Sequence, residues 1–146
     1  GGTSLADAEC FQRVADIVLT QSGENRAVVV SAVGGITDLL FRLIENAAER
    51  EPIDELMTEL RERYEVIVRE LLSPEEGSAF LDQFEIDLSD INSVLKALAL
   101  VKSASHRSRD MVSGFGELWS SRILSALLGH QLIVIRMFYV LMRVMF

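Results

Sequence analysis

Apolar residues recur at helical spacing along most of this chain. The stripes cover residues 5–20, 37–48, 52–71, 79–98 and 111–127. Side chains three and four positions apart share one face of a helix, so each stripe predicts a helix with one buried side. Ser4 and Asp7 have the spacing of a capping box, Ser73-Pro74 is typical of a helix start, and Gly129 is a natural helix stop. Polar residues at 87–90 indicate a short break in the fourth stripe.

A different pattern interrupts these stripes between residues 26 and 38. Val28, Val29 and Val30 form a β-branched run, which predicts a strand over 27–30 that is buried on both faces. Gly34-Gly35 follows as a tight turn, and Thr37 is placed to cap the next helix. A strand, a glycine turn and a helix N-terminus together can form an anion site from backbone N–H groups. The alternative interpretation is an ordinary strand-to-helix turn.

This alternation predicts an α/β fold with three layers. The strand over 27–30 is expected at the centre, and helices 5–20 and 37–48 are expected to cover its faces. The apolar run 132–135 fits a second buried strand. The 146 residues suffice for one domain with a sizeable core.

Composition excludes several classes of function. The net charge of −8 argues against nucleic-acid binding, which depends on clustered Lys and Arg. The apolar tail 132–146 is too short to span a membrane and carries two arginines, so no membrane association is expected. A single cysteine, Cys10, cannot form an internal disulfide or a cysteine-built zinc site, and its place on a helix favours a buried thiol. No targeting segment is recognisable at the start of the chain.

Few of the remaining polar residues suggest chemistry. The charges over 59–65 lie mostly off the apolar stripe and indicate a solvated helix face, and His106 is expected to face solvent. Gly114 and Gly116 interrupt a helical pattern, which indicates a bend or the close approach of another group. Glu117 follows directly; by itself it is either a helix-face charge or a ligand-binding carboxylate.

Three motifs point to one family. They are GGTS at 1–4, VVVSAVGGIT at 28–37 and SGFGELWS at 113–120. In this order they resemble the aspartate kinases of the amino-acid kinase superfamily, in particular the plant-type bifunctional aspartokinase–homoserine dehydrogenases. The resemblance runs from Gly1 to about Leu128. It implies that residues 1–146 are the N-terminal part of an aspartate kinase catalytic domain, with a helical insert at 52–102 and an atypical tail at 130–146.

The resemblance also implies a reaction and a site. The family transfers the γ-phosphoryl group of ATP, with Mg²⁺, to the β-carboxylate of L-aspartate, giving 4-phospho-L-aspartate for lysine, threonine and methionine synthesis. Carried over motif by motif, the nucleotide phosphates would lie against Gly1, Gly2, Thr3 and Ser4. Ser31 would act at the reacting groups, Thr37 would bind aspartate, and Glu117 would hold the α-amino group of the substrate. We expect Ser31, Thr37 and Glu117 to converge on one pocket, with no metal ligands from the protein.

Other expectations concern the setting of the chain. By resemblance, the full-length enzyme is a homo-oligomer, located in the chloroplast if it is of the plant type and in the cytoplasm otherwise. The family's phosphate-neutralising lysine, just before the GG pair, and its second nucleotide-binding half lie outside this sequence, so the chain alone is expected to lack kinase activity. Two alternatives stay open. One is a helical interaction module or truncated isoform that pairs with a full-length subunit. The other is an amino-acid kinase for glutamate, carbamate or a nucleotide, which the GFGELWS motif disfavours.

Overall fold

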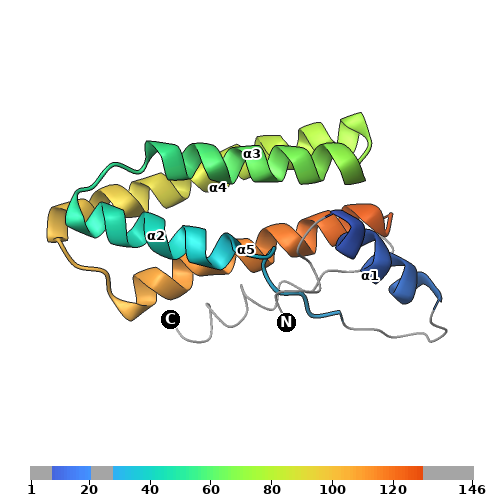
Figure 1. Cartoon of the computed structure of the whole chain (residues 1–146), viewed down its shortest axis with the longest axis horizontal. Helices are drawn as coiled ribbons and strands as arrows, with labels where there is room; N and C mark the ends of the chain where they lie inside the picture. Colours follow the sequence, from blue (N-terminus) through green and yellow to red (C-terminus); the bar gives the residue numbers. More distant parts are fainter. Residues whose placement is uncertain (1–7, 21–27, 130–146) are drawn as a thin grey trace.

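The computed structural model describes residues 8–20 and 28–129, and the regular elements in these ranges are five α-helices (Figure 1). They are α1 (Ala8–Thr20), α2 (Ile36–Glu49), α3 (Asp54–Leu71), α4 (Pro74–Val101) and α5 (His106–Leu127). Figure 1 shows α2, α3, α4 and α5 running along the long axis of the molecule, with α3 beside α4. Helix α2 packs against α3, α4 and α5, whereas α1 packs against α3 and α5. Most of the core therefore lies around α2.

The predicted start of α4 is confirmed in detail. The Ser73 hydroxyl accepts a hydrogen bond from the Glu76 backbone N–H at 3.3 Å, and the Glu76 carboxylate accepts one from the Ser73 N–H, also at 3.3 Å. This capping box, with Pro74 in the first turn, satisfies N–H groups that a helix leaves unpaired. Helix α5 also has a serine N-cap, because the Ser105 hydroxyl accepts from the Ser108 N–H at 3.1 Å.

The prediction of a three-layer α/β fold is wrong for the described part of the chain. Residues Val28–Val30 belong to no strand, and all regular elements in 8–20 and 28–129 are helical. A strand needs a neighbouring extended segment to receive its backbone hydrogen bonds, and no described segment offers one. The valine run is also not buried on both faces, because Val29 is 82% exposed. Residues 1–7, 21–27 and 130–146, including the predicted strand 132–135 and the Ser4–Asp7 capping box, lie outside the described residues.

Three helix boundaries also differ from the predictions. Gly35, not Thr37, is the N-cap of α2, so Thr37 lies inside the first turn and no side chain caps this helix. Helix α3 begins at Asp54, two residues after the start of the predicted helical stripe 52–71. The predicted break at 87–90 is absent, because α4 continues through it to Val101.

Aromatic side chains fill the space between α3, α4 and α5. The Tyr64 ring lies edge-on to Trp119 at 5.0 Å between centroids, and Phe84 lies 4.7 Å from the same indole. Phe80 stacks on Phe84 at 6.0 Å. Offset and edge-to-face arrangements of this kind add to the gain from burying the rings. This aromatic cluster (Tyr64, Phe80, Phe84 and Trp119) is the contact by which α5 docks on the α3–α4 pair.

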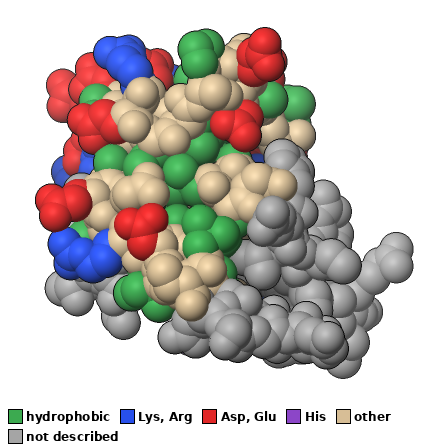
Figure 2. Space-filling view, turned by 90° about the vertical axis from the view of Figure 1, so that its right-hand side faces the viewer, with side chains coloured by type: hydrophobic (Ala, Val, Ile, Leu, Met, Phe, Trp, Pro, Cys, Tyr) green, Lys and Arg blue, Asp and Glu red, His purple; other side chains and the backbone are tan. Residues whose placement is uncertain are grey.

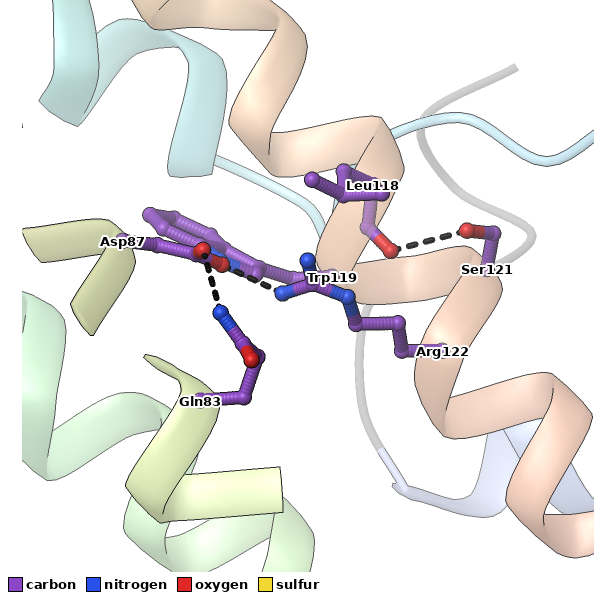
Figure 3. A network of polar contacts seen from close by, with 6 residues as sticks. All are labelled: Gln83, Asp87, Leu118, Trp119, Ser121 and Arg122. Atoms are coloured by element: carbon purple, nitrogen blue, oxygen red, sulfur yellow. Dashed lines mark hydrogen bonds and ion pairs between the residues drawn. The ribbon is translucent and has the colours of Figure 1, made fainter. Parts of the chain in front are cut away.

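A buried carboxylate explains why α4 does not break at Asp87. This residue is only 5% exposed, and its Oδ2 accepts a hydrogen bond from the Trp119 indole N–H at 2.8 Å (Figure 3). The Arg122 guanidinium forms an ion pair with the same oxygen, and the Gln83 amide donates to Oδ1 at 3.2 Å. Charge and hydrogen-bond partners together offset the cost of burying the carboxylate. A residue that looks like a surface charge in the sequence therefore joins α4 to α5.

Other charges stay at the surface. Figure 2 looks at one end of the molecule and shows acidic and basic side chains along the top and left of the view, with apolar side chains toward the middle. The Arg61 guanidinium bridges α3 to α4 through both oxygens of Glu85, at 2.7 and 3.1 Å, but both side chains are substantially exposed. Exposed pairs of this kind contribute little to stability.

The Asp87 network gives a first prediction. Asp87→Asn removes the negative charge while keeping the size of the side chain, so it leaves the Arg122 cation without its counter-ion. We expect the free energy of unfolding to fall by about 2–3 kcal/mol, below the loss for a fully buried pair because Arg122 is partly exposed. Urea denaturation followed by circular dichroism measures the change. The matched control is Asp90→Asn, an exposed aspartate of the same helix, which should change stability by less than about 0.5 kcal/mol. Equal, small effects of both variants would contradict the assigned role of Asp87.

Candidate functional site

The glycine turn before α2 is held by an arginine from α3. Gly35 has φ 77°, a left-handed conformation that glycine adopts without strain. The Arg63 guanidinium donates a hydrogen bond to the Gly34 carbonyl oxygen. Its Nη1 also lies where a side chain at Gly35 would project, 3.2 Å from an ideal Cβ. The turn therefore combines a helix N-terminus with a cation, and both features favour bound anions.

The second glycine of the GFGE motif allows α5 to approach this turn. A Cβ at Gly116 would lie 2.7 Å from the Ala32 Cβ and 3.4 Å from Ile36 Cγ2. These two residues flank the turn, so the motif at 31–37 and the motif at 114–117 are in direct contact. The predicted close approach of another group is confirmed, and α5 continues through both glycines. Only a residue without a side chain fits this contact.

Three of the predicted site residues can be placed relative to this contact. Ser31 precedes Ala32, Thr37 follows Ile36, and Glu117 follows Gly116, so each is the chain neighbour of a residue in the contact. All three side chains are half-buried. No hydrogen bond joins them to one another in the described ranges, and their convergence on one pocket stays a prediction. Gly1, Gly2, Thr3 and Ser4 lie outside the described residues. His106 is exposed, as expected.

Three buried polar atoms of the described residues have no hydrogen-bond partner. Within 8–20 and 28–129, the buried side-chain oxygens without a hydrogen-bond partner are Tyr64 Oη, Glu117 Oε2 and Ser120 Oγ. Glu117 and Ser120 lie one turn apart on the same face of α5. Folded proteins rarely leave such atoms unpaired unless a water, ion or ligand satisfies them.

The electrostatics of Tyr64 tie it to the same region. Burial raises the pKa of the Tyr64 phenol well above its ordinary value, the Arg63 guanidinium lowers it, and the Glu117 carboxylate raises it further. The phenol therefore feels both a cation at the glycine turn and an anion on α5. Because burial dominates, the hydroxyl keeps its proton at neutral pH.

Sequence reasoning missed both Arg63 and Tyr64 as site residues. Arg63 lies among the charges over 59–65, most of which are indeed exposed, and Tyr64 occupies the apolar stripe of α3. The only sequence signal for a site here was that Arg63 and Tyr64 are adjacent, at the border between the charged and the apolar face of α3. In the described ranges, no group of three or more His, Cys, Asp or Glu residues could hold a metal ion. Likewise, no described helix is long and apolar enough to cross a membrane.

Comparisons with known proteins identify the family of this chain. The sequence profile of the amino acid kinase family matches residues 1–140, so the chain belongs to the amino acid kinase family. It is 34% identical over 126 residues to the chloroplastic bifunctional aspartokinase/homoserine dehydrogenase 1 of Zea mays, covering 86% of this chain and 14% of that protein. It is also 34% identical over 135 residues to chloroplastic aspartokinase 1 of Arabidopsis thaliana, of which it covers 22%.

A solved structure is similar as well. Aspartokinase III of E. coli, in complex with lysine and aspartate, matches 90% of this chain with a TM-score of 0.74 and 32% sequence identity. The chain covers 28% of that structure. It therefore spans less than a third of each of these relatives and has the helical arrangement of the corresponding part of an aspartokinase.

The contact between the two motifs can be tested by adding a side chain at Gly116. Gly116→Ala places a Cβ at 2.7 Å from the Ala32 Cβ, so α5 or the turn must shift. We expect stability to fall by about 1–3 kcal/mol from overpacking, although alanine is the better helix former by about 1 kcal/mol. Thermal and urea denaturation measure the change. The compensating variant Gly116→Ala/Ala32→Gly removes the clashing methyl group and should recover most of the loss. A stabilised Gly116→Ala protein would show that helix propensity outweighs the contact.

The buried phenol predicts a loss of stability at alkaline pH. Above about pH 10, tyrosine in the unfolded chain loses its proton while the folded protein keeps the Tyr64 proton, because the folded-state pKa is raised. The unfolded state is then favoured by about 1.4 kcal/mol per pH unit. Tyr64→Phe removes this contribution, so the stability of the wild type relative to the variant should fall as pH rises from about 9 to 11. A difference that is independent of pH would mean that the hydroxyl is not buried in solution.

Proposed function

We propose that this chain forms the aspartate-binding part of an aspartate kinase. The full enzyme would transfer the γ-phosphoryl group of ATP to the β-carboxylate of L-aspartate. The observation that carries the proposal is the direct contact between the turn 31–37 and the GFGE segment of α5, made possible by Gly116. Family membership supports the reaction class, and the aspartate in the complex of the E. coli relative supports the acceptor.

Glu117 is the residue proposed to hold the α-ammonium group of aspartate. Its carboxylate is half-buried and has an unpartnered oxygen. A carboxylate that faces an ammonium forms charge-assisted hydrogen bonds, which are about twice as strong as neutral ones. The site thus offers an acceptor that a bound amino acid would satisfy.

Thr37 and Ser31 are proposed to act at the other end of the substrate. Thr37 lies in the first turn of α2, where unpaired backbone N–H groups and the helix dipole favour a carboxylate or a phosphoryl group. The nearby Arg63 cation adds to this preference. Ser31, which precedes the glycine turn in the chain, would contact the reacting groups. Phosphoryl transfer depends mainly on positioning and on neutralising charge, which is the chemistry that these groups can supply.

ATP and Mg²⁺ are part of the same proposal. The phosphates would lie against Gly1, Gly2, Thr3 and Ser4, as the family motif implies. Mg²⁺ commonly binds through substrate phosphates with few protein ligands, so a cluster of carboxylates is not required for it. The pathway to lysine, threonine and methionine, and a chloroplast location in a plant, follow from the same relationship, since the maize and Arabidopsis relatives are named as chloroplastic proteins. Assembly with further copies in the full enzyme belongs to the proposal too.

Binding of L-aspartate to the chain tests the proposal. We expect Glu117→Gln to weaken the binding by about 10- to 100-fold, because it removes the charge that faces the ammonium. NMR titration of the ¹⁵N-labelled protein with L-aspartate, L-glutamate and succinate measures affinity and selectivity. The control is Asp110→Asn, an exposed acid on α5 that should leave the affinity unchanged.

The outcomes separate the alternative functions. Tighter binding of glutamate than of aspartate would favour another amino-acid kinase. No binding of either amino acid to the wild-type chain, with the fold intact, would contradict the aspartate site and leave the helical interaction module as the function to examine.

A further inference from the structure

The glycine turn before α2 has a conformation that its own sequence does not fix. The Ile36 N–H donates to the Val33 carbonyl oxygen at 3.0 Å, and Gly35 has φ 77° and ψ −5°. Gly34 does not share the positive φ of Gly35. These values define a type II turn with the two glycines at its centre. Because glycine adopts many turn conformations without strain, a Gly-Gly pair can also form a type I turn, in which the central peptide is reversed.

Arg63 contacts the face of this turn that distinguishes the two types. In a type II turn the central carbonyl, here that of Gly34, lies on the side where a side chain of the next residue would project. The Arg63 guanidinium lies on that side. It donates to the Gly34 carbonyl oxygen, and its Nη1 is 3.2 Å from the ideal Cβ of Gly35. A reversed peptide would turn its carbonyl away and lose this hydrogen bond, so the contact favours one orientation.

The core of α3 places Arg63 for this contact. The next residue, Tyr64, is fully buried in the aromatic cluster, which limits the rotation of the helix. Arg63 itself is half-buried, and its hydrogen bond among the described residues is the one to Gly34. The neighbouring arginine, Arg61, instead pairs with Glu85 on α4. A role in the turn is therefore specific to Arg63.

Holding the carbonyl also sets the direction of the N–H in the same peptide. The C=O and N–H of a trans peptide point in opposite directions, so the Gly35 N–H points away from Arg63. Gly35 is exposed, and no described residue accepts a hydrogen bond from this N–H. The first N–H groups of α2, which follows directly, favour an anionic group. The turn thus offers one further donor next to the helix start at which Thr37 is proposed to bind substrate.

We propose that Arg63 is the positioning residue of the glycine turn: it holds the Gly34 carbonyl toward α3 and so keeps the Gly35 N–H available to an anionic group of the substrate. The substrate part rests on the proposed aspartate site, with a carboxylate or a phosphoryl group as the anion. The hold on the turn does not depend on that site. A planar guanidinium can donate to the carbonyl and cover the adjacent glycine at once, which the compact ammonium group of lysine cannot do.

The turn can be examined without any ligand. In a type II turn the Gly35 amide proton lies close to an α-proton of Gly34, whereas in a type I turn it lies close to the Gly34 amide proton. Nuclear Overhauser spectra of the ¹⁵N-labelled protein distinguish the two. We expect the first contact in the wild type and a clear contribution of the second in Arg63→Met, which removes the donors but keeps a long side chain. The matched control Arg61→Met should keep the wild-type pattern. An unchanged pattern in folded Arg63→Met protein would overturn the proposal.

The second measurement asks whether the hold on the turn serves binding. We expect Arg63→Met to weaken L-aspartate binding about three- to tenfold, as for the loss of one oriented donor, and Arg61→Met to leave it within about twofold of wild type. The ratio of wild-type to Arg63→Met affinity should persist at about 0.5 M salt, because salt screens the attraction of a charge but not the direction of a hydrogen bond. A ratio that falls to one in salt would show that Arg63 acts only through its charge, which overturns its positioning role.

The outcomes keep the two proposals separate. A wild-type chain that binds no aspartate, but whose turn changes in Arg63→Met, would refute the aspartate site and still support the hold of Arg63 on the turn. An unchanged turn in Arg63→Met, with aspartate binding intact in the wild type, would refute the hold and leave the aspartate site standing.

Discussion

The contact between Gly116 and Ala32 is the constraint on which the rest of the structure depends. A methyl group at position 116 would approach the Ala32 Cβ to 2.7 Å, so α5 can lie against the turn before α2 only because this position has no side chain. Once the contact is made, the residues next to it are positioned as well. Ser31 and Glu117 are chain neighbours of the two contacting residues. The two glycines near the contact, Gly114 and Gly116, lower the helix propensity of α5.

The orientation of α5 is set by a different kind of interaction. The indole of Trp119 packs in the aromatic cluster and donates to the buried Asp87, which also pairs with Arg122 (Figure 3). Apolar packing alone permits a helix to rotate or slide, whereas an N–H donor and a buried charge must meet their partners. Glu117 lies on the same helix, two residues before Trp119, so the network in the core also helps to place this residue.

The functional proposal and the fold meet in a few polar groups at the border of the core. Arg63 holds the glycine turn, Tyr64 packs against Trp119, and Asp87 holds α5. Each looks ordinary in the sequence, because a charge on a solvated face and a tyrosine on an apolar stripe are common features. Their partners are 29 to 32 residues away along the chain for Gly34–Arg63 and Asp87–Trp119, and such pairings follow from packing rather than from local pattern.

The sequence by itself determined the helices and the family. Helical periodicity predicted all five described helices, Ser73-Pro74 indicated the start of α4, and three motifs in order indicated an aspartate kinase, because these signals are local. Tertiary structure decided the rest. The valine run 28–30 has strand composition, but a strand exists only with a hydrogen-bonding neighbour, and no described segment provides one. Asp87 lies in a polar stretch that predicted a helix break. In the structure the Trp119 indole and the Arg122 guanidinium pair with its carboxylate and allow it to be buried, because the stability of a charge depends on what surrounds it.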